Sequence, residues 1–312
     1  MIDRIWVGRG RSFFAVRFIS ALMVAASLLT PGSLRAEEVS LDYKGNTLLG
    51  TLTMAEGKKM SDGVLLVLHG TLAHKDMEII TALRDLMAER GFSTLTPSLS
   101  LGLSNRRGMY DCAVTHTHRH MDAVDEVAVW VNWLKKKGAG SIWVAGHSRG
   151  AKQIVQYALG TPDAAVKKVI SIAPSVSGRK KLVAGFKRTH KADLSSVLTR
   201  AEKLIAEGKG DMVMKGVGIL YCPGADVTAS SFVGYYGKDL RLNTAKMASG
   251  LNLPTLFVGG SEDTVNPGVA AAVKSMVDNK KISVVEVEGA GHFFRDLFGE
   301  DVADAISEFI GG

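Results

Sequence analysis

Five residues near the middle of the chain form a pattern that presents a serine hydroxyl for nucleophilic attack: Gly146, His147, Ser148, Arg149 and Gly150. They follow SIWVA, which predicts a strand, and precede AKQIVQYAL, which predicts a helix. In this strand–turn–helix context the turn is tight, and glycines flank the serine where a Cβ would collide with neighbouring backbone. The pattern therefore predicts that Ser148 lies at the tip of the turn with its hydroxyl exposed.

A serine hydroxyl is a weak nucleophile until a neighbouring base removes its proton. The best candidate for this base is His292, which follows the apolar segment SVVEV within GAGHFF. The histidine in turn needs an acid that fixes its tautomer and stabilises the imidazolium. Asp263 comes just after the strand-like segment TLFV and is the first candidate, with Glu262 as the alternative. We therefore predict a triad of Ser148, His292 and Asp263.

Negative charge that develops on an attacked carbonyl oxygen needs two preorganised donors. One is expected to be the backbone N–H of Arg149, the residue after the nucleophile. The other is expected after the apolar run GVLLVL, where His69 and Gly70 let the backbone turn and Thr71 supplies its N–H. We expect a structural role for His69. Two roles stay open for the Arg149 side chain, which can pack behind the turn or contact an anionic substrate group.

The segments around these residues alternate between strand-like and helix-like patterns. A hairpin is expected over residues 39–54, a continuous apolar run predicts a buried strand at 63–68, and a further strand is expected at 168–172. Apolar side chains recur at helical spacing over 76–90 and 122–136. Strands that alternate with helices in this way predict a mostly parallel sheet with helices on both faces. The chain is therefore expected to belong to the α/β class.

The alternation stops between residues 175 and 253. This stretch has one clear amphipathic helix, over about 194–205, and later an aromatic group of Phe232, Tyr235 and Tyr236. We interpret it as an inserted cap over the carboxyl edge of the sheet, with these aromatic side chains on its underside. Basic residues gather at its start: Arg179, Lys180, Lys181, Lys187, Arg188 and Lys191. They predict a solvated surface, with a preference for acidic substrates as the alternative.

Taken together, these features resemble the α/β-hydrolase superfamily over about residues 39–312. The matching features are the His69-Gly70 loop, the GHSRG turn, Asp263 in GSEDTV and His292 in GAGHFF, with serine, acid and histidine in the family's order. The resemblance implies an eight-stranded, mostly parallel sheet with helices on both faces and a helical cap inserted after the sixth strand. It also implies hydrolysis of an ester, thioester or amide of a small-molecule acyl substrate through an acyl-serine, with no cofactor and no metal. Members with an aspartate or cysteine nucleophile are disfavoured, because position 148 is serine.

Three alternatives to a serine hydrolase stay open. An acyltransferase would use the same triad but exclude water and accept an alcohol or an amine. A catalytically silent binding protein of this fold is the second, although no triad member is missing. The third is a metal-dependent hydrolase that uses the alternating histidines of HTHRH, namely His116, His118 and His120. No carboxylate or cysteine cluster completes that set. We therefore expect these histidines at a solvent-facing or substrate-facing helix start, where Asp111 and Asp122 can pair with them.

The first 36 residues have the pattern of an export signal. A basic start leads into an apolar run from Phe18 to Leu29, and Leu34-Arg35-Ala36 offers a cleavage site before Glu37. The run is shorter than the ~20 residues that span a bilayer. We therefore expect export to the bacterial periplasm or beyond, with an uncleaved N-terminal anchor as the alternative. One α/β-hydrolase domain is expected over residues 37–312.

The net charge of +7 could indicate a nucleic-acid partner, so its location matters. The first 36 residues hold five basic residues and one acidic residue. Without them 33 basic and 30 acidic residues remain, which is a net charge of +3. We therefore expect no nucleic-acid partner, and no stable membrane span after the signal is removed.

The chain has two cysteines, Cys112 and Cys222, and both lie in the part that is expected to be exported. An oxidising compartment permits a disulfide between them. Their spacing does not show whether they are close in space. A disulfide and two free, partly buried thiols are therefore both open.

Overall fold

A computed structural model describes residues 35–237, 243–276 and 280–312. Residues 33–312 group into one unit. The predicted export signal lies outside the described residues, apart from Arg35 and Ala36 at the start of the first strand. None of the helices within the described residues is long and apolar enough to cross a membrane.

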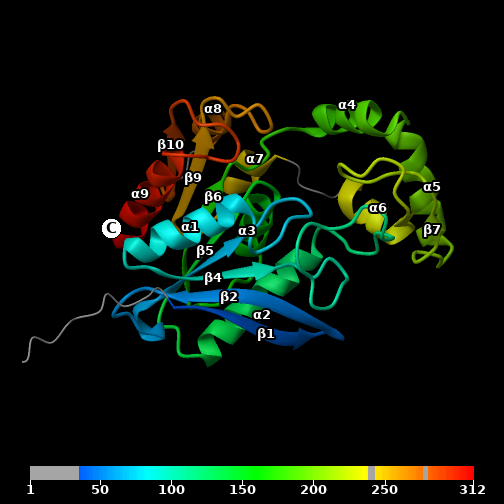
Figure 1. The fold of residues 1–312 in the computed structure, drawn as a ribbon. Coiled ribbons are helices and arrows are strands. Elements are labelled where there is room, and N and C mark those ends of the chain that lie inside the picture. Colours follow the sequence, from blue (N-terminus) through cyan, green and yellow to red (C-terminus); the bar gives the residue numbers. More distant parts are fainter. Residues whose placement is uncertain (1–34, 238–242, 277–279) are drawn as a thin grey trace, which may run out of the picture. The chain divides into compact units, whose positions relative to one another are not determined.

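An eight-stranded sheet forms the centre of this unit (Figure 1). Its spatial order is β1, β2, β4, β3, β5, β6, β9, β10. The strands are β1 Arg35–Tyr43, β2 Asn46–Met54, β3 Val64–Leu68, β4 Ser93–Ser98, β5 Ile142–His147, β6 Val166–Ile172, β9 Thr255–Gly260 and β10 Ile282–Val287. Among them β2 alone runs against its neighbours, and the pairs from β4 to β10 are all parallel. The predicted mostly parallel, eight-stranded sheet is confirmed.

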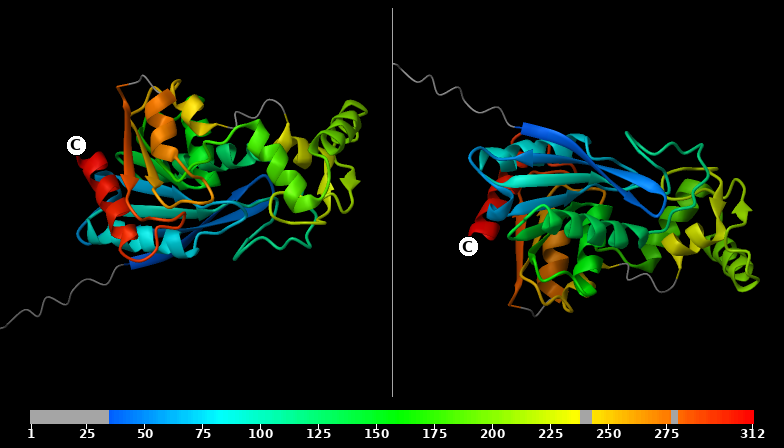
Figure 2. Two further views of the ribbon diagram at one scale, coloured as in Figure 1. Left: turned by 90° about the horizontal axis from the view of Figure 1, so that it is seen from above. Right: turned by 90° about the horizontal axis from the view of Figure 1, so that it is seen from below.

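Helices cover both faces of the sheet (Figure 2). One face carries α1 Glu78–Glu89 and α9 Phe298–Gly311, and the other carries α2 Asp122–Lys136, α3 Arg149–Leu159 and α8 Val269–Met276. Strand β3 contributes side chains to the core on both faces of the sheet. Leu65 and Val67 pack with α1 and α9, whereas Leu66 and Leu68 pack with α2 and α3. Because successive side chains point to opposite faces, a strand buried on both faces needs a continuous apolar sequence.

Helix α2 illustrates how the sequence sets a helix that positions the site. Val127, Trp130, Val131 and Leu134 recur at helical spacing, and each is at most 1% exposed. Acidic residues occupy the first turn and lysines the last, which complements the helix dipole. The helix therefore packs one apolar face firmly on the sheet and fixes the loop that precedes it.

The insertion at residues 175–253 lies between β6 and β9, after the sixth strand as the resemblance implies. It contains helices α4 Arg179–His190, α5 Leu194–Ala206, α6 Ala229–Tyr236 and α7 Thr244–Ala248, and the short pair β7 Val213–Met214 and β8 Val227–Thr228. Only α5 had a clear helical pattern in the sequence. Helix α4 buries a single residue, Phe186, so its apolar spacing is weak. Figure 1 shows α4, α5 and α6 beyond the ends at which β4 and β5 terminate.

Candidate active site

Ser148 lies in the turn between β5 and α3, with φ 56° and ψ −114°. A positive φ is strained for any residue other than glycine, and such strain is typical of functional turns. The flanking glycines make the turn sterically feasible. A Cβ at Gly146 would lie 2.5 Å from the backbone of Gly150, and a Cβ at Gly150 would overlap the carbonyl oxygen of His69. The structure therefore requires glycine at both positions that the sequence pattern singled out.

The three residues of the predicted triad form one hydrogen-bonded row. His292 Nε2 is 2.9 Å from Ser148 Oγ, and His292 Nδ1 is 2.7 Å from Asp263 Oδ2. Ser148 follows β5, Asp263 follows β9 and His292 follows β10. These strands are parallel and near one another in the sheet, so their carboxyl ends bring the three side chains together. The arrangement suits transfer of the serine proton to His292 Nε2.

Asp263 is the acid of the row, and Glu262, the alternative, is exposed. The Asp263 side chain is buried, and its Oδ1 accepts hydrogen bonds of 2.8 Å from the N–H groups of Val265 and Asn266. Burial acts to raise the pKa of this carboxyl. The hydrogen bonds from His292 and from the two amides outweigh it, so the pKa lies below its usual value. Asp263 is therefore ionised at neutral pH and can hold His292 in the tautomer with Nδ1 protonated.

Thr71 and Arg149 present backbone N–H groups that find no acceptor among the described residues. The loop that carries Thr71 closely approaches the nucleophile, since a Cβ at Gly70 would lie 3.3 Å from the Ser148 Cβ. Free donors beside a nucleophile are what a developing oxyanion needs. The geometry is thus compatible with the two donors expected from the sequence.

His69 holds this loop in place. Its Nε2 accepts the N–H of Leu99 at 3.0 Å, so Nδ1 carries the proton and donates to the carbonyl of Gly70 at 2.9 Å. Burial, with the nearby Arg106, lowers the His69 pKa to about 3, which keeps the ring neutral. His69 therefore has the structural role expected for it.

Comparison with known proteins decides the family. A family model described as "Alpha/beta hydrolase family" matches residues 64–305 of the chain. The chain belongs to this family. The search among curated proteins finds no match.

Solved structures of other proteins resemble this hydrolase in fold. Est1E from Butyrivibrio proteoclasticus is 20% identical with a TM-score of 0.60, over 88% of this chain and 97% of that one. The Pyrococcus furiosus esterase Pf2001 is 16% identical with a TM-score of 0.56, over 89% and 91%. An alpha-beta serine hydrolase homologue from Coxiella burnetii is 18% identical with a TM-score of 0.52, over 87% and 96%. At these identities the similarity concerns the fold, and the predicted α/β-hydrolase fold is confirmed.

His147 is a further residue at the site of this hydrolase that the sequence pattern did not single out. It is buried, and its Nε2 donates to the carbonyl oxygen of His292 at 2.8 Å. Its ring also lies 4.9 Å from the His292 ring. Burial, with the nearby His292, lowers the His147 pKa to about 4, so the ring is neutral. His147 therefore positions the loop that carries the triad histidine.

The expectation of a solvent-facing or substrate-facing HTHRH segment is wrong. His116, His118 and His120 are at most 2% exposed. His116 Nδ1 is 3.1 Å from His118 Nε2, and His118 Nδ1 is 2.8 Å from the Tyr235 hydroxyl in α6. The three histidines face the cap and are buried by it, whereas Thr117 and Arg119 between them are exposed. The backbone N–H of His116 donates to the backbone carbonyl of Asp226, and the carbonyl of His116 accepts the N–H of Thr228 in β8.

Pairing of these histidines with Asp111 or Asp122 is also wrong. Asp111 accepts the N–H of Ala113 in a local turn, and Asp122 accepts the N–H of Arg119. Both carboxylates thus accept hydrogen bonds from backbone N–H groups close to them in the sequence. Across residues 35–237, 243–276 and 280–312, no group of three or more His, Cys, Asp and Glu side chains is arranged to hold a metal ion.

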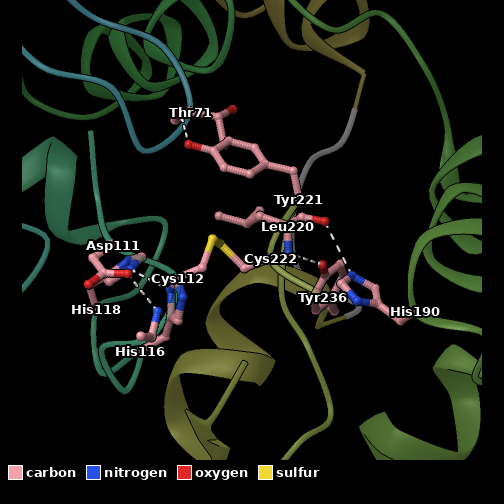
Figure 3. Close-up of a disulfide and its surroundings, with 11 residues drawn as sticks. Thr71, Asp111, Cys112, His116, His118, His190, Leu220, Tyr221, Cys222 and Tyr236 are labelled. Atoms are coloured by element: carbon pink, nitrogen blue, oxygen red, sulfur yellow. Dashed lines mark hydrogen bonds between the residues drawn. A yellow bond between two sulfur atoms is a disulfide. The ribbon is translucent and has the colours of Figure 1, made fainter. Parts of the chain in front are cut away.

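A disulfide joins Cys112, in the loop before α2, to Cys222 in the cap (Figure 3). The neighbouring Tyr221 reaches across the loop and donates its hydroxyl to the carbonyl of Thr71 at 3.4 Å. Figure 3 shows this ring between the disulfide and Thr71. The crosslink therefore holds the cap near the loop that carries one candidate oxyanion donor.

Removal of this disulfide is expected to lower the melting temperature by roughly 10 °C. The two cysteines are 110 residues apart, and closing a loop of ~100 residues restricts the unfolded chain by about 4–5 kcal/mol. The measurement is a thermal melt of Cys112→Ala/Cys222→Ala beside the oxidised wild type. The wild type melted in a thiol reductant is the control and should match the variant. Equal melting temperatures for variant and oxidised wild type would contradict this expectation.

A cavity of about 400 Å³ opens beside Ser148 and is the size of a small-molecule site. Tyr235 and Tyr236 of α6 line it, whereas Phe232 is fully buried in the core of the cap. A larger hollow of about 1100 Å³ lies against β10 and α9, and no triad residue lines it. The cavity beside Ser148 is therefore the candidate substrate site.

Proposed function

We propose that this protein is a serine hydrolase that cleaves an ester, or a thioester or amide, through an acyl-serine intermediate. The observation that carries the proposal is the hydrogen-bonded row from Ser148 through His292 to Asp263, with Ser148 lining a cavity. Two of the structures with this fold, from Pyrococcus furiosus and Coxiella burnetii, are named as an esterase and a serine hydrolase homologue.

In the proposed reaction Ser148 Oγ attacks the acyl carbon while His292 Nε2 takes the hydroxyl proton. Asp263 stabilises the imidazolium, and the N–H groups of Thr71 and Arg149 hold the oxyanion. His292 then gives its proton to the leaving group, which departs and leaves the acyl-serine. A water that loses its proton to His292 attacks this ester, and the acid is released as Ser148 recovers its proton.

We also propose that the enzyme acts outside the cytoplasm, in the periplasm or the medium. The disulfide between Cys112 and Cys222 supports this location, because such bonds persist in oxidising compartments. A cavity of about 400 Å³ supports a small-molecule acyl substrate.

A fluorophosphonate probe tests the proposed nucleophile, because it phosphonylates an activated serine. We expect labelling of the wild type and none of Ser148→Ala. The control is Ser275→Ala, which changes an exposed serine on α8 away from the cavity. An unlabelled wild type, or labelling that survives in Ser148→Ala, would rule out the proposed mechanism. Product analysis with p-nitrophenyl esters and added alcohol then separates hydrolysis from acyl transfer.

A further inference from the structure

Two cationic side chains lie in the cavity beside Ser148 without a carboxylate partner. Arg149 and Lys152 belong to the first turn of α3, and their spacing of three residues places them on one helix face. The described lining of the cavity contains no aspartate and no glutamate. Among the described residues, neither cation forms an ion pair. The cavity therefore carries uncompensated positive charge next to the nucleophile.

Lys152 is the more unusual of the two. The residue is 6% exposed, and its Nζ makes no hydrogen bond within the described part of the chain. Burial, with the nearby Arg149, lowers its pKa to about 7. An unpaired buried ammonium destabilises a fold, and such groups concentrate at functional sites. A structural lysine would have a partner, so this one points to a ligand that brings the missing charge.

Arg149 is oriented by neutral groups that leave its charge unbalanced. Its Nε donates to Thr71 Oγ1 at 3.1 Å, and its Nη1 lies 3.4 Å from His120 Nδ1. His120 Nε2 binds Gln156 at 2.6 Å, so Nδ1 is free to accept. The guanidinium also lies 5.3 Å from the centre of the Tyr235 ring. These contacts fix the guanidinium, and Nη2 makes no hydrogen bond to the part of the chain that the structure describes.

The cap adds charge of the same sign. Lys181 and Arg188 are seven residues apart on α4, which places them on one helix face, and both line the rim of the cavity. They are exposed, as the sequence predicted for this basic segment, and they would attract an anion toward Arg149 and Lys152. The alternative interpretation of the basic residues at the start of the cap, a preference for acidic substrates, therefore has structural support.

We propose that the cavity binds an anionic oxygen group of the substrate, a carboxylate or a phosphate, between Arg149 and Lys152. The planar guanidinium suits two parallel hydrogen bonds to such a group, and Lys152 supplies a point charge. Because the guanidinium is held at Thr71, whose N–H is one proposed oxyanion donor, an anion bound to it lies close to the cleaved carbonyl. The substrate is thus an ester or related acyl compound that carries an acid group close to the scissile bond. This inference rests on the proposed hydrolase function for its catalytic meaning, whereas anion binding is measurable without turnover.

The first test is calorimetric binding of glutarate, inorganic phosphate and uncharged dimethyl glutarate to the full chain. We expect glutarate or phosphate to bind and dimethyl glutarate not to bind, and the tighter anion identifies the carboxylate or phosphate source. Lys152→Met should weaken the binding at least tenfold. Lys187→Met is the matched control, because Lys187 is exposed on α4 and does not line the cavity, and it should bind as the wild type does. No binding to the wild type, or equal binding to Lys152→Met, would overturn the proposal.

Two further readouts separate an anion site from a lysine with a structural role. Lys152→Met should raise the melting temperature by several degrees, since it removes an unpaired buried cation, whereas loss of a structural lysine would lower it.

Glutarate affinity should also fall as the pH rises from 6 to 8, because Lys152 loses its proton in that range. The other charged or titratable groups that face it are Arg149, Lys181, Arg188, His120, Tyr221, Tyr235 and Tyr236. Burial lowers the pKa of His120 and raises those of the three tyrosines, so these four stay neutral from pH 6 to 8. Lys152→Met should abolish the pH dependence.

A pair of esters then links the anion site to catalysis. We expect kcat/KM for p-nitrophenyl hemiglutarate to exceed that for p-nitrophenyl valerate at least tenfold in the wild type. In Lys152→Met this ratio should approach one, mainly through KM for the hemiglutarate. Efficient hydrolysis of valerate without a preference for hemiglutarate would refute the anion site but keep the hydrolase. A wild type that the fluorophosphonate probe does not label would refute the proposed hydrolase function. The calorimetry would still decide whether the cavity binds an anion.

Discussion

Replacing Asp263 with asparagine is expected to lower kcat about 10⁴-fold, a loss typical when the triad acid becomes an amide. Asp263 Oδ2 accepts the Nδ1–H of His292 at 2.7 Å, and its Oδ1 is held by two backbone N–H groups. An asparagine that keeps its oxygen toward those amides presents its NH₂ to His292. The ring must then carry its proton on Nε2, and it can no longer accept the proton of Ser148.

Glu262→Gln is the matched control for this experiment. Glu262 is adjacent in sequence and was the alternative acid, yet it is exposed. Its N–H binds the carbonyl of Ala290 whatever the side chain is. We expect kcat within about twofold of the wild type for this change, in keeping with surface substitutions. A large loss of kcat in Glu262→Gln, or a small loss in Asp263→Asn, would show that Asp263 is not the acid that acts on His292.

The residues of the row could be predicted because each follows a segment that the local sequence predicts to be a strand. Ser148 has flanking glycines that only a tight turn requires, and Asp263 follows an apolar run that predicts a buried strand. His292 follows SVVEV, a strand-like segment that forms the partly exposed edge strand β10. Parallel strands end at the same edge of a sheet, so the order of the elements alone indicates that their carboxyl ends meet. The hydrogen-bonded row of Ser148, His292 and Asp263 thus follows from short-range sequence patterns and one topological rule.

The cap and its contacts could not be predicted in the same way. The burial of His116 and His118 depends on β8 and α6, which lie about a hundred residues further along the chain. Local sequence shows only alternating polar residues there, which is typical of an exposed segment. Lys152 likewise has the expected spacing of a surface residue on an amphipathic helix. Its burial becomes visible only when the cap is in place above α3.

Acidification from pH 7 to pH 5 is expected to lower the free energy of unfolding by at least about 6 kcal/mol. Among the buried histidines, burial is the main cause that lowers the pKa to about 3 for His69 and His118 and about 4 for His116 and His147. The pKa of His120 is lowered too, and its protonation on unfolding adds to the loss. In the unfolded chain each has a pKa of about 6.5, so below that pH the unfolded state binds protons that the folded state does not. Each histidine contributes stability above pH 6.5, and each loses about 2 kcal/mol of it by pH 5.

Glu126 acts in the opposite direction. It is buried beneath Ser100, and burial raises its pKa to about 7. The pKa of Glu126 in the unfolded chain is about 4.3, so between that pH and pH 7 the folded state binds an extra proton. This proton raises the free energy of unfolding by about 2 kcal/mol at pH 5. Carboxylates with lowered pKa values, Asp263 among them, lose their contribution only at lower pH, as they approach protonation. Between pH 7 and pH 5 the stability therefore depends on the buried histidines, less the opposing contribution of Glu126.

Urea titrations at half-unit steps between pH 7 and pH 5 would measure this dependence. Near pH 5 the slope should be at least about 4 kcal/mol per pH unit, which corresponds to roughly three or more protons taken up on unfolding, and the melting temperature should fall by roughly 10–20 °C over the range. His118→Gln provides the internal control, because it should reduce the slope by about one proton whatever it does to stability at pH 7. A flat profile would mean that the histidines bind protons in the folded state. In that case the hydrogen-bonded row from His116 through His118 to Tyr235 would not be closed to water as its burial implies.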